Sequence, residues 1–365
     1  MSNPNILVIG AGAIGCLVGG KLAQKGFAVT IAGRGRFVDE VQQYGGLRIE
    51  QAAGQQIVES IRPAASIQQA FEHSSTGFEL ALLTVKSYDT ELAVQELFQA
   101  AKVCGFDLPM VISLQNGVGN EEAIASLLGP AYVVAGNITT PVSVISPGRI
   151  RVDRESSDIG LSPWHPAISQ TRFEFAQQAL SEAGFSITIY PDAQGLKWTK
   201  VLMNMLGNAS SAILGLPPED VFAHSQLLNL EISAWREALA VMRSAKIPPV
   251  NIGSYTFSSW APLIRRTPKF LLRFILRSQI GKSRGGKMPS LYLDLDGGKT
   301  KSEVGWLNGA ISAKGKLVNI PTPINTMYTE VLNAIVHQPQ KRELWHNANL
   351  RLLVTADEYR ERVKS

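Results

Sequence analysis

The chain has 365 residues, of which 45% are hydrophobic and 18% are charged. This balance argues against wholesale disorder, which requires low hydrophobicity and high net charge, and a chain of this length usually divides into two domains. The net charge of +5 is modest and would matter for binding only where it is clustered.

The cysteine content and the length of the apolar runs argue against a disulfide-rich, a zinc-binding and a membrane-spanning protein. Cys16 and Cys104 supply neither a disulfide framework nor a zinc-ligand set, so we expect a reducing, cytoplasmic location and no metal site. No segment reaches the roughly 18 consecutive apolar residues that a membrane span requires. We therefore expect no membrane span.

The first half of the chain alternates strand and helix patterns, which is typical of a doubly wound parallel sheet. We expect strands at 5–10, 27–32, 79–86, 110–115 and 185–190, short extended pieces at 47–50 and 55–61, and antiparallel additions at 133–145, 148–153 and 157–162. Helices are expected at 13–25, 90–101, 120–128 and 166–183. These elements predict an α/β Rossmann-type N-terminal domain covering residues 1–190.

From residue 193 onward the sequence shows helix-length periodic segments and no convincing strand, which predicts an all-α C-terminal domain covering residues 191–365. Residues 238–293 hold ten Lys or Arg and no Asp or Glu, and eight of the ten lie at 265–287 among Leu, Phe and Ile. This segment is either a helical insertion with solvated arginines or a surface that faces substrate, acidic lipid or a partner. Nucleic acid is not expected, because no recognised binding module accompanies the charge.

A glycine pattern after the first strand indicates a dinucleotide site. Gly10-Ala11-Gly12-Ala13-Ile14-Gly15 matches G-x-G-x-x-G and opens a helix within a strand–helix–strand unit. In this motif Gly10 permits the tight turn, Gly12 lets the backbone approach the pyrophosphate, and Gly15 permits close helix packing. The alternative is a glycine-rich turn without a ligand, which the flanking strands and helix make the weaker interpretation.

The end of the second strand indicates which dinucleotide is bound. NAD sites usually place an acid there, but the first acidic residue of this chain is Asp39. Arg34 occupies that place, with Arg36 two residues further on, and a guanidinium suits the 2′-phosphate of NADP. We predict NADP (NADPH) as the cofactor, with Arg36 the better candidate for a merely solvated arginine.

Two polar residues follow the next strands of the predicted sheet. Lys86 ends one strand and Asn116 ends another, and open α/β sheets bind ligands at the carboxyl ends of their strands. Lys86 alone could be a strand-end lysine that extends to solvent, and Asn116 alone could be a turn former. Together the two residues favour a ligand-binding site at this edge of the sheet.

A polar row marks the first helix of the second half. Lys200, Asn204 and Asn208 have i, i+4, i+8 spacing, so on one continuous helix over 193–213 they would share a face. Apolar residues surround the row, which suggests that it is partly buried and needs partners such as a substrate. The alternative is an exposed helical face.

These features together resemble a known family. They are Gly10–Gly15, Arg34, Val85-Lys86, Gln115-Asn116-Gly117, Lys197-Trp198-Thr199-Lys200-Val201 with Asn204 and Asn208, and Ser302-Glu303 followed by Leu307-Asn308-Gly309. The order and spacing resemble the ketopantoate reductase family, NADPH-dependent 2-dehydropantoate 2-reductases. The resemblance implies a Rossmann domain, a helical domain and a cleft between them.

The resemblance also implies residue roles. Lys200 would be the proton donor, and Asn204, Asn208 and Ser290 would contact substrate. Lys86, Asn116 and Glu303 would help to hold cofactor and substrate, and Glu303 is the carboxylate expected near Lys200. We expect a small-molecule 2-keto acid as the substrate and a homodimer as the candidate assembly.

Three functions remain open. The first is reduction of ketopantoate to pantoate in the pantothenate route. The second is the same chemistry on another 2-keto acid, because Leu216-Pro217-Pro218 and the long basic segment depart from the family pattern. The third is a binding protein that senses NADPH without turnover, against which the intact Lys-Asn-Asn row argues.

Overall fold

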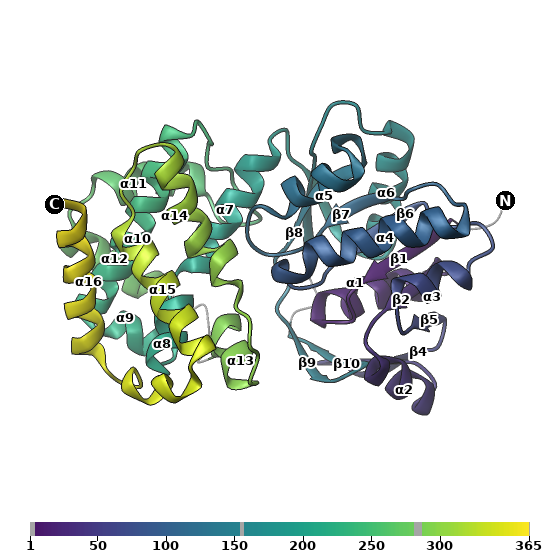
Figure 1. Cartoon of the computed structure of the whole chain (residues 1–365), viewed down its shortest axis with the longest axis horizontal. Helices are drawn as coiled ribbons and strands as arrows, with labels where there is room; N and C mark the ends of the chain where they lie inside the picture. The colour runs from purple at the N-terminus through teal and green to yellow at the C-terminus, as the bar shows by residue number, and fades with distance from the viewer. Residues whose placement is uncertain (1–3, 154–156, 281–286, 365) are drawn as a thin grey trace. The chain divides into compact units, whose positions relative to one another are not determined.

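The structure is a computed structural model that describes residues 4–153, 157–280 and 287–364 (Figure 1). It forms two compact units, one of Met1–Gln115 with Gly119–Lys197 and the other of Asn116–Val118 with Trp198–Ser365. The sequence placed the domain boundary at residue 190. The contacts divide the chain between Lys197 and Trp198, inside helix α7 (Ala193–Met205), and assign the short loop Asn116–Val118 to the second unit.

Within the described residues, the first unit contains an eight-stranded sheet with the order β12-β11-β8-β7-β6-β1-β2-β5. Its strands are β1 (Asn5–Ile9), β2 (Ala28–Ala32), β5 (Ile61–Ala64), β6 (Leu80–Leu83), β7 (Met110–Ser113), β8 (Val133–Ile138), β11 (Asp158–Pro163) and β12 (Ser186–Ile189). Neighbouring strands are parallel except β8 and β11. The parallel register brings the carboxyl ends of β1, β2, β6 and β7 to one edge.

Helices cover both faces of this sheet because side chains alternate along each strand. Ile6 and Val8 of β1 enter one core, whereas Leu7 and Ile9 enter the other. The first core also receives α1 (Ala13–Gln24), α2 (Gly35–Gln43) and α6 (Gln170–Glu182), and the second receives α3 (Ile67–Glu72), α4 (Thr90–Cys104) and α5 (Asn120–Leu128). Two short 3-10 turns, η1 (Ser87–Asp89) and η2 (Pro130–Tyr132), complete the unit. The expected Rossmann-type architecture is confirmed.

A second, four-stranded sheet of the described chain has the order β4-β3-β10-β9. Its strands are β3 (Leu47–Gln51), β4 (Gly54–Val58), β9 (Val142–Ser146) and β10 (Arg149–Val152). The short extended pieces expected at 47–50 and 55–61 pair as the antiparallel strands β3 and β4, but Ile61 was wrongly included in the second piece, since it starts β5 in the main sheet.

The expectation of one antiparallel addition over 133–145 was confirmed only in part, because the segment forms two strands in different sheets. β8 pairs antiparallel with β11 but parallel with β7 in the main sheet, and β9 pairs antiparallel with β10 in the small sheet. Pro141 lies between β8 and β9 and lacks the N–H that would continue the ladder, so it separates the two strands.

The second unit is helical, and among its described residues no β-strand is present, which confirms the all-α expectation. Its helices are the end of α7, α8 (Asn208–Leu214), α9 (Pro218–Ala223), α10 (Ser225–Ser244), α11 (Phe257–Arg266), α12 (Lys269–Ile280), α13 (Ser290–Asp296), α14 (Asn308–Leu317), α15 (Pro323–His337) and α16 (Asn349–Lys364), with 3-10 turns η3 (Glu303–Trp306) and η4 (Pro339–Leu344). Helix α10 packs against α9, α11, α12, α14, α15 and α16. Among the described residues no helix has the length and hydropathy needed to cross a bilayer.

Candidate functional site

The turn after β1 has a shape that only glycine permits at two positions. Gly10 has φ +110°, and a Cβ added there would lie 2.8 Å from the backbone N of Val85. A Cβ on Gly15 would lie 1.9 Å from the carbonyl O of Gly10. The hydroxyl of Thr84 donates to that same carbonyl at 2.8 Å, which ties the turn to the end of β6. The first and third glycines of the motif therefore serve the turn itself.

Gly12 differs from these two, because a Cβ on it would meet nothing within 4 Å. Gly12 is exposed and is the N-cap of α1, and no side chain caps this helix start. The first N–H groups of an α-helix have no partner within the helix and carry the positive end of its dipole. The turn formed by Gly10, Ala11 and Gly12, with Ala13 and Ile14 at the helix start, therefore fits a pyrophosphate.

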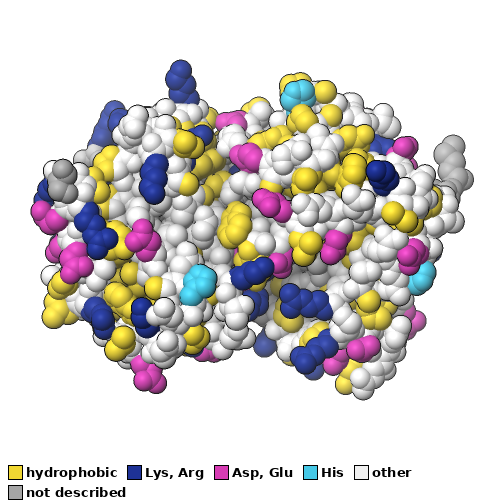
Figure 2. Space-filling view, viewed as in Figure 1, with side chains coloured by type: hydrophobic (Ala, Val, Ile, Leu, Met, Phe, Trp, Pro, Cys, Tyr) yellow, Lys and Arg dark blue, Asp and Glu magenta, His cyan; other side chains and the backbone are white. Residues whose placement is uncertain are grey.

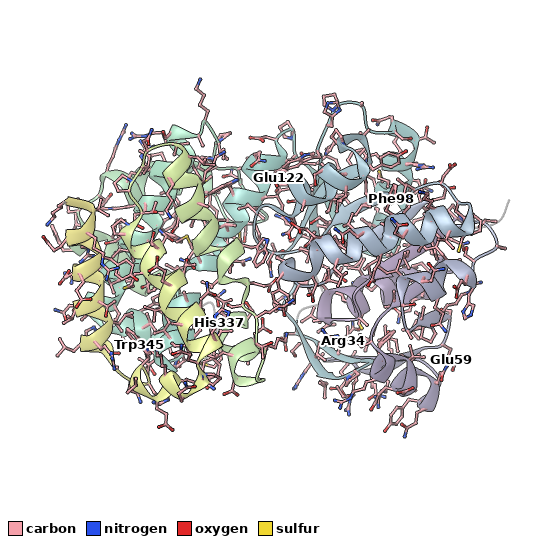
Figure 3. The ribbon with its side chains drawn as sticks, viewed as in Figure 1. Arg34, Glu59, Phe98, Glu122, His337 and Trp345 are labelled. Atoms are coloured by element: carbon pink, nitrogen blue, oxygen red, sulfur yellow. The ribbon has the colours of Figure 1, made fainter. Side chains whose placement is uncertain are left out.

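Arg34 lies where the sequence placed it, just after β2 and at the N-cap of α2, where Figure 3 labels it. A Cβ on the preceding Gly33 would lie 2.5 Å from Cβ of Ala11, so the two turns are in close contact. Arg34 is exposed and, among the described residues, forms no ion pair. Arg36 is also exposed but lies within α2. Arg34 thus follows directly on the residue that contacts the glycine-rich turn.

A buried amide network fixes the loops that follow β6 and β7. Gln115 donates from Nε2 to the carbonyl of Val85 at 2.9 Å and to Oγ1 of Thr90 at 2.7 Å. Thr90 in turn donates to Oδ1 of Asn120 at 2.9 Å. Lys86 follows Val85 and is half-buried at the start of η1. The network holds the backbone on which Lys86 stands, and the sequence analysis did not identify it.

In the second unit, Lys200 and Asn204 lie one turn apart on α7 and share a face, as predicted. Lys200 is 8% exposed, so it is a largely buried residue. Asn204 donates from Nδ2 to Oδ1 of Asn116 at 2.9 Å. This hydrogen bond places the strand-end asparagine beside the lysine helix.

The loop Asn116–Val118 also binds η3. The N–H of Val118 donates to the carbonyl of Trp306 at 3.1 Å. A Cβ on Gly117, whose φ is +84°, would lie 2.7 Å from the same carbonyl, so this approach requires glycine. Glu303 begins η3 and is 5% exposed. One loop therefore links the turn that carries Glu303 to the helix that carries Lys200.

The expectation of one continuous helix over 193–213 was wrong. Helix α7 ends at Met205, Gly207 adopts a left-handed φ of +65°, and α8 begins at Asn208. The i, i+8 relation between Lys200 and Asn208 therefore does not place them on one face. Asn208 is 4% exposed, and its Oδ1 accepts the N–H of Leu291 at 3.2 Å.

That hydrogen bond brings two predicted substrate residues together by an unexpected route. Leu291 is the second residue of α13, and Ser290 is the first. Asn208 thus satisfies an N–H at the start of the helix that Ser290 opens, and Ser290 is exposed. The family resemblance predicted that Asn208 and Ser290 both contact substrate. The structure brings them close because Asn208 accepts an N–H of the first turn of α13, which Ser290 begins.

Glu231 holds the break between α7 and α8, and the sequence analysis did not find it. Its carboxylate accepts the N–H of Gly207 at 2.6 Å and the hydroxyl of Tyr328 at 2.8 Å. Glu231 is 2% exposed. Burial, followed by the charge of Glu231, raises the pKa of Tyr328 well above its usual value, so Tyr328 remains a donor. The sequence feature that could have predicted the break is Gly207, a glycine inside an otherwise apolar helical pattern.

These features define a class: a Rossmann-type α/β unit with a dinucleotide turn, followed by a helical unit with a buried lysine and an amide-bearing loop. Family profiles assign the class further. Residues 6–165 match the profile described as "Ketopantoate reductase PanE/ApbA", and residues 192–336 match "Ketopantoate reductase PanE/ApbA C terminal". The chain belongs to the ketopantoate reductase family.

Individual relatives agree with this assignment. The chain is 30% identical over 329 residues to a 2-dehydropantoate 2-reductase of Pyrococcus horikoshii, covering 90% of this chain and 96% of the relative. A PanE/ApbA family ketopantoate reductase from Ralstonia eutropha JMP134 superposes with a TM-score of 0.75 at 26% identity, covering 92% of this chain and 99% of that one. A ternary structure of D-mandelate dehydrogenase with NADH and anilino(oxo)acetate shares the fold, with a TM-score of 0.74 at 21% identity and coverage of 91% and 98%.

Proposed function

We propose that this protein reduces a 2-keto acid to the 2-hydroxy acid with NADPH, and that 2-dehydropantoate is the substrate. The observation that carries the proposal is the set of contacts around one loop: Asn116 binds Asn204 one turn from the buried Lys200, and Val118 binds the turn that Glu303 begins. For carbonyl reduction, a lysine can donate the proton, an amide can orient the carbonyl, and a carboxylate can favour the charged lysine. Membership in the family supports the choice of substrate.

The cofactor would be held by the first unit. Backbone groups of the turn Gly10–Gly15 suit the pyrophosphate, since Gly12 leaves that approach open. Arg34 would bind the 2′-phosphate, which favours NADPH over NADH. Lys86 and Asn116, in the loops that follow β6 and β7, are proposed to assist. When bound, NADPH supplies the hydride for the carbonyl carbon.

Lys200 is the proposed general acid. Negative charge develops on the carbonyl oxygen during reduction, and an ammonium group both stabilises that charge and supplies the proton. Desolvation at 8% exposure strengthens this electrostatic interaction. Glu303, also buried, is proposed to favour the charged lysine. Proton donation would leave Lys200 neutral until solvent returns the proton.

The amides are proposed to orient the substrate. Asn204 uses one hydrogen of Nδ2 for Asn116, and the second hydrogen can meet a carbonyl or carboxylate oxygen. Asn208 uses Oδ1 for the N–H of Leu291, so its contact with substrate would come from Nδ2. Ser290, exposed at the start of α13, is the fourth proposed contact.

A second candidate is the same reaction on a different 2-keto acid. Pro217 and Pro218 begin the short helix α9, where the sequence departs from the family pattern. The fold is shared with D-mandelate dehydrogenase, whose name indicates a different 2-hydroxy acid. The third candidate, a binding protein without turnover, is disfavoured by the buried Lys200 with Asn204 on the same face.

The test is NADPH consumption with a panel of 2-keto acids that differ in the side chain. The proposal expects turnover that is highest with 2-dehydropantoate and absent without a keto acid. A higher kcat/KM with an aromatic or linear 2-keto acid would support the second candidate. NADPH binding without turnover on any member of the panel would contradict the enzymatic proposal.

A further inference from the structure

The helices α11 and α12 carry large apolar side chains on their solvent side. Phe270 is 61% exposed and Phe274 is 80% exposed, and their i, i+4 spacing places them on one face of α12. Leu271 is 46% exposed, and Leu263 of α11 is 39% exposed. Large apolar side chains gathered on the exposed face of α12 differ from singly scattered surface residues and are typical of a binding surface.

The opposite side of the same helices is buried. Leu272 and Leu276 of α12 are 0% and 2% exposed, and Ile264 of α11 is 2% exposed. All three belong to the core of the helical unit. The helices are therefore already packed through one apolar face, and the exposed phenylalanines form a second one. Packing against the core of the helical unit does not require this second, exposed apolar face.

Basic side chains flank the exposed apolar face. Arg273 of α12 is half-buried and lies beside the row of Phe270 and Phe274. Arg266, at the end of α11, is exposed. The sequence between Glu237 and Asp294 contains no carboxylate, so no acidic side chain of this segment neutralises these two arginines. Glu219 and Asp220 lie on α9, which packs against α12.

Polar contacts anchor the pair of helices to α10. Arg236 donates from Nε to the carbonyl of Ile264 at 2.9 Å and also binds the carbonyl of Thr267, at the end of α11. Lys269 donates to Oγ of Ser233 at 2.8 Å. These hydrogen bonds hold α11 and the start of α12 against α10. Figure 2 shows that basic and acidic side chains are intermingled on the visible face of the helical unit.

We propose that the outer face of α11 and α12, defined by Leu263, Phe270, Leu271 and Phe274 with the flanking Arg266 and Arg273, binds an anionic lipid surface peripherally. A helix that lies in the headgroup layer buries Phe and Leu at the acyl boundary while Lys and Arg meet lipid phosphates. A second copy of the chain suits this surface less well, because a two-fold contact would bring the same basic side chains toward one another. The proposal is independent of the catalytic function.

Flotation of the full chain with lipid vesicles tests the proposal. We expect binding to phosphatidylcholine vesicles that contain phosphatidylglycerol, little binding to phosphatidylcholine alone, and weakening as salt is raised. The double variant Phe270→Ser/Phe274→Ser should lower binding by about tenfold or more, since two buried aromatic side chains are lost. The double variant Arg266→Gln/Arg273→Gln should lower binding to anionic vesicles in particular.

Matched controls lie on the same unit. Leu317→Ser on α14 and Leu350→Ser on α16 remove side chains that are 78% and 74% exposed, and both variants should bind as the wild type does. A circular-dichroism spectrum and a thermal unfolding midpoint close to those of the wild type show that the phenylalanine variant has folded. Equal binding by the phenylalanine variant, or no binding by the wild type, would overturn the proposal. Self-association mediated by these phenylalanines would overturn the lipid proposal in favour of a second copy of the chain. Retention on polyglutamate without vesicle binding would overturn it in favour of an acidic protein partner.

Discussion

The ammonium group of Lys197 lies 2.9 Å from the carboxylate of Glu121, and these side chains are only 2% and 1% exposed. Lys197 also donates to the carbonyl of Gln115 at 2.6 Å and to that of Gly136 at 3.2 Å. All four residues belong to the first unit. Lys197 therefore joins the end of β7 to α5 and β8, and its donors are committed to structure. This separates it from Lys200, three residues further along α7.

Replacing Lys197 should therefore affect stability first. Lys197→Met leaves the Glu121 carboxylate buried without its cation, and breaking a buried pair in this way costs about 3–5 kcal/mol of the free energy of unfolding. Denaturant titration measures the loss. Lys102→Met, which removes an exposed lysine of α4, is the control and should stay within about 0.5 kcal/mol of the wild type. A Lys197→Met protein as stable as this control would contradict the structural role.

Replacing Lys200 should instead affect the chemical step. Lys200→Met keeps the apolar stem but removes the proton and the positive charge, so kcat should fall by about 10²–10⁴-fold. NADPH affinity should be nearly unchanged, because Arg34 and the glycine-rich turn lie in the other unit. Steady-state kinetics and a fluorescence titration with NADPH measure the two quantities. If Lys200→Met retains most of its turnover, the general acid has been assigned to the wrong residue.

Arg34 and Arg36 form a matched pair for cofactor choice. Arg34→Ala should raise the KM for NADPH by about 10–100-fold, as expected for the loss of one charged hydrogen bond, and should leave the KM for NADH nearly unchanged. Arg36→Ala, on the same exposed stretch but inside α2, should change either value by less than about threefold. Equal use of NADH and NADPH by the wild type would refute the assignment.

Glu237 should make stability depend on pH. Burial raises the pKa of Glu237 to about 7, although the N–H groups of Asn325 and Ile324 and the amide of Asn325 donate to its carboxylate and oppose the shift. The folded state then binds the proton more tightly than the unfolded state, whose pKa is 4.5. The stabilisation is complete below the unfolded pKa and is lost as pH rises toward the folded pKa, by about 1 kcal/mol per pH unit.

Denaturant titrations of the wild type and Glu237→Gln at several pH values across this window measure the effect. The difference between the two proteins isolates Glu237 from the histidines, which titrate in the same range. The free energy of unfolding of the wild type should fall relative to that of the variant as pH rises. A difference that does not vary with pH would show that the three hydrogen bonds outweigh burial and keep the carboxylate charged.

Several features of both units could be predicted from local sequence patterns. The glycine motif predicted the tight turn, and the structure gives its reasons in the φ of Gly10 and the close approach at Gly15. Arg34 was placed correctly because it follows β2 directly in sequence. Lys200 and Asn204 were placed on one face because a single turn of helix separates them. Each of these relations spans a few residues, over which backbone geometry is determined locally.

Relations between distant residues were decided only by tertiary structure. Asn208 leaves the face of Lys200 because Gly207 breaks the helix, and the break is held by Glu231 from α10. Lys197 is structural because Glu121, remote in sequence, pairs with it in the interior. A residue's period along the chain predicts which face of an element it occupies. Whether the element continues, and which buried partner its polar groups meet, depends on contacts that no local pattern contains.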